Sequence, residues 1–137
     1  ASNHMPQKLK DKMEGNVKSP SGVPHLDTFL PILLNEVNSG KLKLQLLSKL
    51  VAENPVEIFG LKNKGFIEEG YDADLVLVDM KLRKQIVNED LFSKCGWSLF
   101  EGEELQGFPV MTIVRGSIVY NNGKVYKNRS AKEIQYE

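Results

Sequence analysis

The sequence has few of the residues on which metal binding and covalent cross-linking depend. Its 137 residues include one cysteine, Cys95, and two histidines, His4 and His25. A single cysteine excludes a framework of disulfide bonds, so a cytoplasmic location is expected. A zinc site needs at least three side-chain ligands, commonly in close pairs, and no H-x-H, H-E-x-x-H or C-x-x-C pattern is present. The residues themselves therefore predict no metal site.

The chain also lacks an excess of charge of one sign and a long apolar run. It has 18 basic and 18 acidic side chains, which argues against nucleic acid or an anionic membrane as the main partner. No apolar run approaches the roughly 20 residues needed to cross a bilayer, and no signal-peptide pattern opens the chain. The length is too small for a complete (β/α)₈ barrel of about 250 residues. The 41% of hydrophobic residues is nevertheless typical of a globular protein.

The first half of the chain has the spacing of amphipathic helices. Residues 1–25 are polar, contain several glycines and prolines, and are expected to be mostly loop. Residues 26–59 then carry two apolar stripes with the i, i+3, i+4 period. The first helix should be capped by Asp27 or Thr28, and the second should end at Asn54, which caps a short third helix.

The second half has the spacing of strands. Residues 74–79 form a nearly continuous apolar run between acids, which predicts a strand buried on both faces. Two β-rich runs over 110–120 are followed by Asn121-Asn122-Gly123, a strong signal for a hairpin turn. Helices followed by antiparallel strands indicate an α+β fold.

A cluster of aromatic, acidic and sulfur-containing residues lies between the predicted strands. Trp97, Phe100 and Phe108 are expected to anchor an irregular loop onto the core rather than to bind a ligand. The acidic residues within 101–104 are expected to be solvated. Cys95 has no neighbouring histidine to act as a base, so a buried, inert thiol is expected.

Residues 65–79 resemble a segment of the cyclic amidohydrolases. Their sequence fits the family pattern G-x-I-x-x-G-x-D-A-D-L-V-x-x-D. In that family the segment begins the return of the chain into a small β-sandwich beside the catalytic barrel. Dihydroorotases, hydantoinases, allantoinases and ureases share it, so it indicates a superfamily and not a substrate.

Three further segments resemble dihydroorotases in particular. Residues 93–116 are similar to the ending S-K-x-G-W-S-P-F-E-G…L-x-G-x-P-V-x-T-I-V-R-G. Residues 21–24 resemble the start of the loop S-G-x-P-G-L-E-T after the eighth barrel strand, and residues 54–61 resemble the helix N-P-A-x-I-F-G-L. The segments cover nearly the whole chain in the right order, so the resemblance is specific.

The resemblance implies that the chain corresponds to about the last third of such an enzyme, an α+β fragment. Residues 1–61 would hold a loop and the terminal helices of a TIM-type (β/α)₈ barrel. Residues 62–127 would hold antiparallel strands of the small β-sandwich domain, and residues 128–137 a polar tail. Without the rest of the barrel, apolar helix surface would be exposed around Leu30, Leu34, Leu46 and Leu50.

The same resemblance implies an activity for the longer enzyme. Dihydroorotases interconvert dihydroorotate and N-carbamoyl-L-aspartate in pyrimidine biosynthesis. A zinc-activated hydroxide attacks the ring amide, and a carboxylate at the end of the eighth barrel strand carries the proton. The zinc ligands of the family belong to segments upstream of residue 1. This chain alone is therefore expected to bind no zinc and to be inactive.

The resemblance also assigns candidate site residues. Residues 1–7 can be laid over the family motif A-T-D-H-A-P-H, which puts Asn3 at the position of the catalytic aspartate and Gln7 at that of a substrate-binding histidine. Pro24 and His25 are assigned to substrate binding. His25 replaces the family glycine whose backbone contacts substrate, and its side chain would crowd the site.

Several alternatives stay open on the sequence. Residues 1–5 can also be interpreted as the remnant of a cloning vector that ends in His-Met. The enzyme could instead be an allantoinase or a hydantoinase. Because Asn3 cannot accept a proton as a carboxylate does, the chain could also be part of a non-catalytic scaffold that supports a partner such as aspartate transcarbamoylase. A homo-oligomer, domain-swapped in one form, is expected from the exposed apolar surface.

Overall fold

The computed structural model describes residues 4–14, 19–127 and 132–136. A one-turn helix, α1 (Leu9–Lys12), is followed by α2 (Leu26–Asn38) and by α3 (Leu44–Ser48). A π-helical turn (Lys49–Glu53) joins α3 to α4 (Asn54–Phe59). The strands are β1 (Leu75–Gln85), β2 (Glu104–Val114), β3 (Ser117–Asn121) and β4 (Lys124–Val125), with a 3₁₀ turn at Asn88–Asp90.

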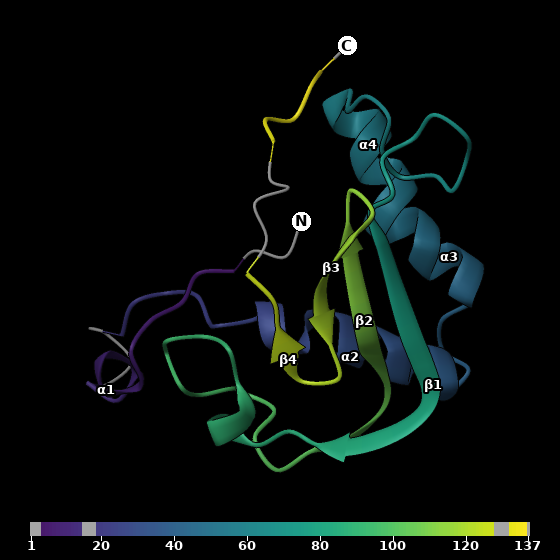
Figure 1. Cartoon of the computed structure of the whole chain (residues 1–137). Helices are drawn as coiled ribbons and strands as arrows, with labels where there is room; N and C mark the ends of the chain where they lie inside the picture. Colours follow the sequence, from purple (N-terminus) through teal and green to yellow (C-terminus); the bar gives the residue numbers. More distant parts are fainter. Residues whose placement is uncertain (1–3, 15–18, 128–131, 137) are drawn as a thin grey trace.

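The strands form one antiparallel sheet in the order β1-β2-β3-β4. In Figure 1 α2 lies behind this sheet, while α3 and α4 lie beside β1. The expected order of helices first and antiparallel strands later is confirmed. The single turn of α1 falls within the segment that was expected to be mostly loop, and none of its residues is buried.

The start of α2 differs from the prediction. His25, not Asp27 or Thr28, is the N-cap residue, and its side chain makes no capping hydrogen bond. The Thr28 hydroxyl donates to the His25 carbonyl at 3.4 Å. The Asp27 carboxylate instead accepts hydrogen bonds from the amides of Phe92 and Ser93, 65 and 66 residues away. This tertiary contact explains why Asp27 does not cap its own helix.

The second predicted helix does not end at Asn54. The backbone of Asn54 is itself helical, with φ −59° and ψ −42°, so α3, the π-helical turn and α4 follow one another without a break. The prediction of Asn54 as a cap is therefore wrong. Gly60, with φ 59° and ψ 44°, ends α4 in the left-handed conformation, which glycine adopts at little cost.

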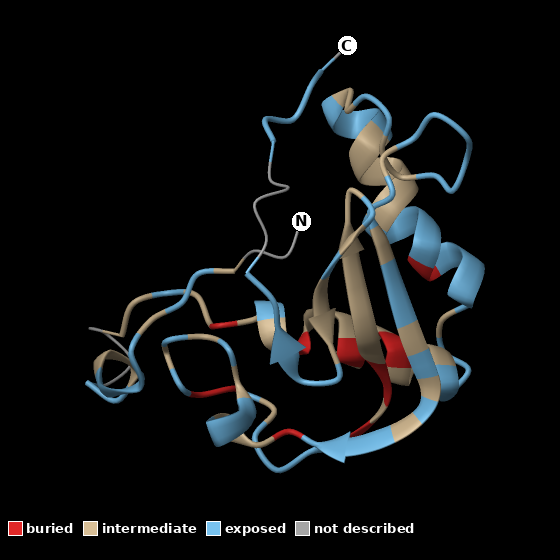
Figure 2. Cartoon of the chain, viewed as in Figure 1, coloured by how far each residue is buried: buried red, intermediate tan, exposed pale blue. Residues whose placement is uncertain are grey.

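Of the predicted strand at 74–79, residues 75–79 lie in the longer β1, which is not buried on both faces. Val76 is 49% exposed and Leu77 is 45% exposed. β1 is an edge strand that pairs only with β2. Because α2 packs against β2, the outer part of β1 stays uncovered, as the pale blue segments of that strand show in Figure 2.

An interruption in the pairing bends β1. The register shifts between Asp79 and Arg83. The Asp79 carboxylate accepts hydrogen bonds from the amides of Lys81 at 2.8 Å and Leu82 at 3.2 Å. These amides would otherwise lose their partners in the ladder, so the bulge is stabilised locally. The hairpin turn after β3 is confirmed: Asn122 and Gly123 both have positive φ, 45° and 85°.

The core is small and lies between α2, β2 and the loop after β1. Leu34 is 1% exposed, so its predicted exposure is wrong, whereas Leu46 and Leu50 are 47% and 48% exposed, as expected. Leu30 is half-buried. The buried apolar side chains, red in Figure 2, are Leu34, Leu47, Ile86, Trp97, Leu105 and Phe108.

Two asparagines fix α2 on β2. The side-chain oxygen Oδ1 of Asn35 accepts a hydrogen bond from the backbone amide of Gln106 at 3.0 Å. The Asn38 side-chain amide donates to the Gln106 carbonyl at 2.9 Å. Gly107 follows, and a Cβ there would lie 2.8 Å from the Cβ of Leu34. The close approach of the helix to the strand therefore requires glycine at this position.

Candidate functional site

Two segments that carry candidate site residues lie side by side at the start of α2. The amide of Met5 donates to the carbonyl of Val23 at 3.3 Å. Gly22 has φ +94°, and a Cβ on it would lie 2.3 Å from the Cβ of Met5. Only glycine allows this approach. Residues 4–7 and 22–26 therefore form one unit, which we call the paired segments.

His4 joins the paired segments through its side chain. Its Nδ1 atom accepts a hydrogen bond from the amide of His25 at 2.9 Å and from the amide of Leu26 at 3.3 Å. From the sequence alone, His4 is assigned no role in the site. Its position within the aligned motif of residues 1–7 was the one signal that could have indicated a role in the site.

The paired segments contain the described candidate residues. Pro24 is buried, while Gln7 and His25 are half-buried. The backbone carbonyl of Gln7 accepts a hydrogen bond from the Trp97 indole at 2.7 Å. The His25 ring packs edge-on against Phe29, with 5.4 Å between centroids. Asn3 lies outside the described residues.

A loop of residues 86–103, which we call the excursion loop, covers one side of the paired segments. Its base is closed by hydrogen bonds between Ile86 and residues 102–103. Its middle is held by Asp27, whose carboxylate binds the amides of Phe92 at 2.9 Å and Ser93 at 3.1 Å. The prediction that aromatic residues anchor this loop is confirmed, because Trp97 and Phe108 are buried and Phe100 packs against the core.

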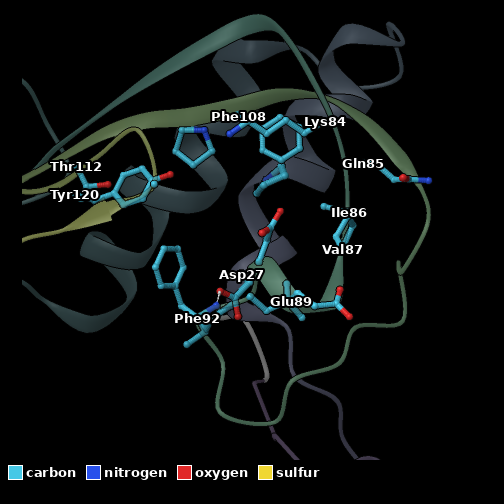
Figure 3. Close-up of a pocket in the computed structure, with 16 residues that line it drawn as sticks. Asp27, Lys84, Gln85, Ile86, Val87, Glu89, Phe92, Phe108, Thr112 and Tyr120 are labelled. Carbon is cyan, nitrogen blue, oxygen red and sulfur yellow. Dashed lines mark hydrogen bonds between the residues drawn. The ribbon is translucent and has the colours of Figure 1, made fainter.

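An open cavity of about 740 Å³ lies between the start of α2, the excursion loop and the sheet. Figure 3 shows Asp27 and Phe92 on one side of it, Lys84 and Phe108 on another, and Tyr120 on a third. The Lys84 ammonium lies 5.7 Å from the centre of the Phe108 ring. Phe92 and Tyr120 meet edge to face at 6.1 Å. The lining of the cavity combines these aromatic side chains with charged residues, which are Asp27, Lys84, Glu89 and Asp90.

The acidic residues of the 65–79 segment form an ion cluster rather than a catalytic pair. The Lys64 ammonium binds Asp72 at 2.7 Å and also contacts Asp74. The Arg115 guanidinium lies 3.4 Å from Asp72, and the Arg115 amide donates to Asp74 at 2.7 Å. The cluster joins the loop before β1 to the turn between β2 and β3, so these carboxylates stabilise the fold.

The ion cluster changes the pKa of two of its members. Burial alone would raise the pKa of Asp74, but hydrogen bonds from Lys64 and from the Arg115 amide, with the charges of both residues, lower it. Burial alone would lower the pKa of Lys64, but hydrogen bonds to Asp72 and Asp74 and the charges of these residues raise it. Each group is thus held in its charged form.

Two smaller predictions have different outcomes. Glu101, Glu103 and Glu104 are exposed, as expected for a solvated acidic segment. Cys95 is half-buried rather than buried. Its amide donates to the Ser93 hydroxyl at 3.4 Å, which keeps it at the surface of the excursion loop.

Comparison with known proteins places this geometry in a family. Residues 26–119 match the model of the amidohydrolase family. The chain belongs to the amidohydrolase family. The match runs from the start of α2 into β3, so it includes the excursion loop and the ion cluster.

Several amidohydrolases that are similar to this chain in sequence are dihydroorotases. The chain is 40% identical to the dihydroorotase of Methanothermobacter thermautotrophicus over 122 residues, which cover 89% of this chain and 28% of that protein. It is 42% identical to the dihydroorotase of Pyrococcus abyssi over 137 residues, which cover all of this chain and 33% of that protein. The chain thus spans about a third of the length of these relatives.

Among solved amidohydrolase structures, the chain is similar to the L-hydantoinase of Arthrobacter aurescens. The two share 34% identity with a TM-score of 0.84, over 89% of this chain and 28% of the hydantoinase chain. The arrangement of helices and strands in this chain is therefore one that occurs within a larger amidohydrolase.

The described part of this amidohydrolase does not itself form a metal centre. No group of three or more His, Cys, Asp or Glu side chains within residues 4–14, 19–127 and 132–136 could hold a metal ion. His4 uses Nδ1 for backbone amides. The residues present thus do not fit a zinc ion. Across the same ranges, no helix is long and apolar enough to cross a membrane.

Proposed function

We propose that this chain is the C-terminal part of a dihydroorotase, which interconverts dihydroorotate and N-carbamoyl-L-aspartate. One observation carries the proposal: the two segments that resemble the dihydroorotase substrate site lie side by side at the start of α2, joined by His4. The identity of about 40% to curated dihydroorotases over most of the chain supports it.

The proposal includes a division of the chain. Residues 1–61 belong to the end of the catalytic barrel, residues 62–127 to the β-sandwich, and residues 128–137 to a polar tail. Three supports are the α-helices confined to the first part, the strands confined to the second, and the matched amidohydrolase structures. The same proposal includes zinc as the metal cofactor, pyrimidine biosynthesis as the pathway and the cytoplasm as the location. The zinc ligands come from a segment of the enzyme outside this chain.

In this proposal the chain supplies residues around the substrate rather than the metal. Asn3 stands at the position of the family's proton-carrying carboxylate, and Gln7, Pro24 and His25 line the substrate side. An amide side chain cannot take up a proton as a carboxylate does. Asn3 therefore predicts that the ring-opening step is slow or absent in a protein with this residue.

Residues 1–5 are proposed to belong to the protein rather than to a cloning vector. His4, through its side chain, and Met5, through its amide, make three hydrogen bonds to the backbone of residues 23–26. The alignment with the Pyrococcus abyssi dihydroorotase also reaches all 137 residues. Both observations support a native origin.

Two other functions are supported by specific observations. The solved hydantoinase at a TM-score of 0.84 favours a cyclic-amide hydrolase with a hydantoin substrate. Asn3 in place of aspartate favours a non-catalytic scaffold that forms a homo-oligomer or supports a partner such as aspartate transcarbamoylase. These alternatives differ in the substrate converted and in whether there is activity at all. Assays of one pair of fused enzymes on several cyclic amides therefore distinguish them.

The test is a fused enzyme in which this chain replaces the aligned last third of the Pyrococcus abyssi dihydroorotase. Two versions are compared, one with Asn3 and one with Asn3→Asp. We expect the Asn3→Asp version to convert dihydroorotate at least a hundredfold faster than the Asn3 version, the order of magnitude for loss of a general base. Metal content and thermal stability of both versions control for folding.

Three outcomes decide between the functions. Conversion of dihydroorotate but not of hydantoin or allantoin supports the proposal. Conversion of hydantoin in its place supports the hydantoinase. A folded, zinc-loaded Asn3→Asp version without activity on any of the three overturns the enzyme proposal and favours the scaffold.

A further inference from the structure

The start of α2 obtains its cap from a distant residue. The first amides of a helix have no partner within the helix. The N-cap residue of α2, His25, makes no capping hydrogen bond through its side chain. His4, 21 residues before His25, fills this role because Nδ1 accepts from the amides of His25 and Leu26. The cap therefore also fixes the distance between the two paired segments.

Both backbone polar groups of residue 25, the amide and the carbonyl, make hydrogen bonds within the chain. Its amide donates to His4 at 2.9 Å. Its carbonyl accepts from the amide of Phe29 at 2.9 Å and from the amide of Thr28 at 3.2 Å. The backbone of this residue is thus engaged by α2 and by His4, which fixes the loop of residues 21–25 at its last residue.

We propose that His4 is a positioning residue of the substrate site, which holds the loop of residues 21–25 in one conformation. This inference rests on the proposed function for its meaning in catalysis. Its structural part, the loop held by Nδ1 of His4, stands on the hydrogen bonds alone. Gly22 and Met5 hold the other end of the same loop.

The structural part is tested in the 137-residue chain by hydrogen exchange and by imidazole ¹⁵N spectroscopy. The oxygen of asparagine occupies nearly the position of Nδ1 in histidine, whereas leucine has no acceptor there. We expect His4→Leu to speed exchange of the His25 and Leu26 amides on the order of tenfold, the size of a lost N-cap, and His4→Asn to restore protection. The Ser39 amide at the other end of α2 is the control and should not change.

The imidazole ¹⁵N spectrum reports which ring nitrogen of His4 carries the proton, a property that does not depend on the stability of the fold. At pH 8 we expect Nδ1 of His4 to carry no proton and to accept hydrogen bonds, while Nε2 carries the proton. A proton on Nδ1, or unchanged exchange in His4→Leu, overturns the inference.

The catalytic part is tested in the fused enzyme with Asn3→Asp. We expect His4→Leu to raise the KM for dihydroorotate by about tenfold with a smaller change in kcat, and His4→Asn to restore the KM. An unchanged KM in His4→Leu overturns the positioning role. If every fused enzyme is inactive, the proposed function and the catalytic role of His4 fall together, and the exchange data still decide whether His4 holds the loop.

Discussion

At the scale of single residues, the contact between α2 and β2 depends on the missing side chain of Gly107. A Cβ there would lie 2.8 Å from the Cβ of Leu34, and φ is +102°. We expect Gly107→Ala to lower the free energy of unfolding by about 3 kcal/mol, from overpacking and from backbone strain together. Urea denaturation followed by circular dichroism measures this loss.

Gly102 provides the matched control for this substitution. Its φ is +84°, but no atom lies within 4 Å of the position a Cβ would take. Gly102→Ala should therefore cost only the strain, about 1 kcal/mol. Equal losses for the two variants would show that the close approach of α2 does not limit stability.

At the scale of elements, the excursion loop is attached to α2 through one carboxylate. Asp27 accepts hydrogen bonds from the amides of Phe92 and Ser93. Removing a charged acceptor leaves these amides without their partner, at a cost of about 2 kcal/mol. We expect Asp27→Ala to speed exchange of both amides and to lower the melting temperature.

Asp27→Asn separates the charge of this side chain from its hydrogen bonding. The amide keeps one acceptor oxygen, so it should retain part of the protection at Phe92 or Ser93. The control variant Asp79→Ala, which removes a carboxylate that binds only the bulge in β1, should leave protection of the excursion loop unchanged. Loss of loop protection in Asp79→Ala would contradict this local assignment.

The ion cluster between the 65–79 segment and the turn after β2 makes stability depend on pH at both extremes. The pKa of Asp74 is lowered by folding, so its contribution is present above the ordinary aspartate pKa of about 4 and is lost in stronger acid. The pKa of Lys64 is raised, so its contribution is present below about 10.5 and is lost as the pH rises through the folded value. Urea denaturation at pH 2 to 11 measures both changes.

Two variants assign these changes to their groups. Asp74→Asn should remove part of the acid-side loss, and Lys64→Met should remove the loss in base. If Lys64→Met keeps the full loss above pH 10, another group is responsible for it. A substitution of Lys41, which pairs with Glu36 at the surface, is the control. It should leave the loss of stability in base unchanged, because exposed pairs contribute little.

Sequence-based prediction succeeded where a feature depends on neighbouring residues and failed where it depends on residues distant in the sequence. The Asn122-Gly123 turn depends on neighbouring residues, and it was predicted. The cap of α2 was missed because it comes from His4, and Asp27 was misassigned because its partners lie in the excursion loop. The exposure of β1 depends on which strand α2 covers, which periodicity alone does not encode.

The candidate site was predictable only through resemblance. Pattern and composition indicated no catalytic group, and the paired segments were identified by their likeness to dihydroorotase motifs. The structure brings Gln7 and His25 into the same unit but gives His4 the linking role. Nothing in the local sequence around His4 distinguishes a ligand of metal from an acceptor of backbone amides.

At the scale of the whole molecule, the chain exposes more surface than its mass requires. Its accessible area is 9,880 Å² for 15.4 kDa, whereas a compact monomer of this mass exposes about 7,200 Å². Part of the excess lies on the helical segment of residues 44–59, where Ile58 is 75% exposed and Phe59 is 61% exposed. Such surface favours association.

We expect the isolated chain to self-associate through this helical segment. Light scattering should give an apparent mass that rises with concentration, and the double substitution Leu46→Lys with Leu50→Lys should bring it toward that of a monomer. Ile67→Lys is the control, since Ile67 is 87% exposed but lies in a loop outside the helices. A constant monomer mass for the unaltered chain would contradict the expectation.

The hydrogen bond from Trp97 to the Gln7 carbonyl also provides the molecule with an optical reporter. Trp97 is the sole tryptophan, is 6% exposed, and its indole nitrogen lies 2.7 Å from that carbonyl. Its emission should therefore shift to longer wavelength when the segment of residues 4–7 detaches and water reaches the ring. Comparing the fluorescence and circular dichroism of one sample would reveal whether the segment leaves before the sheet unfolds, without any added label.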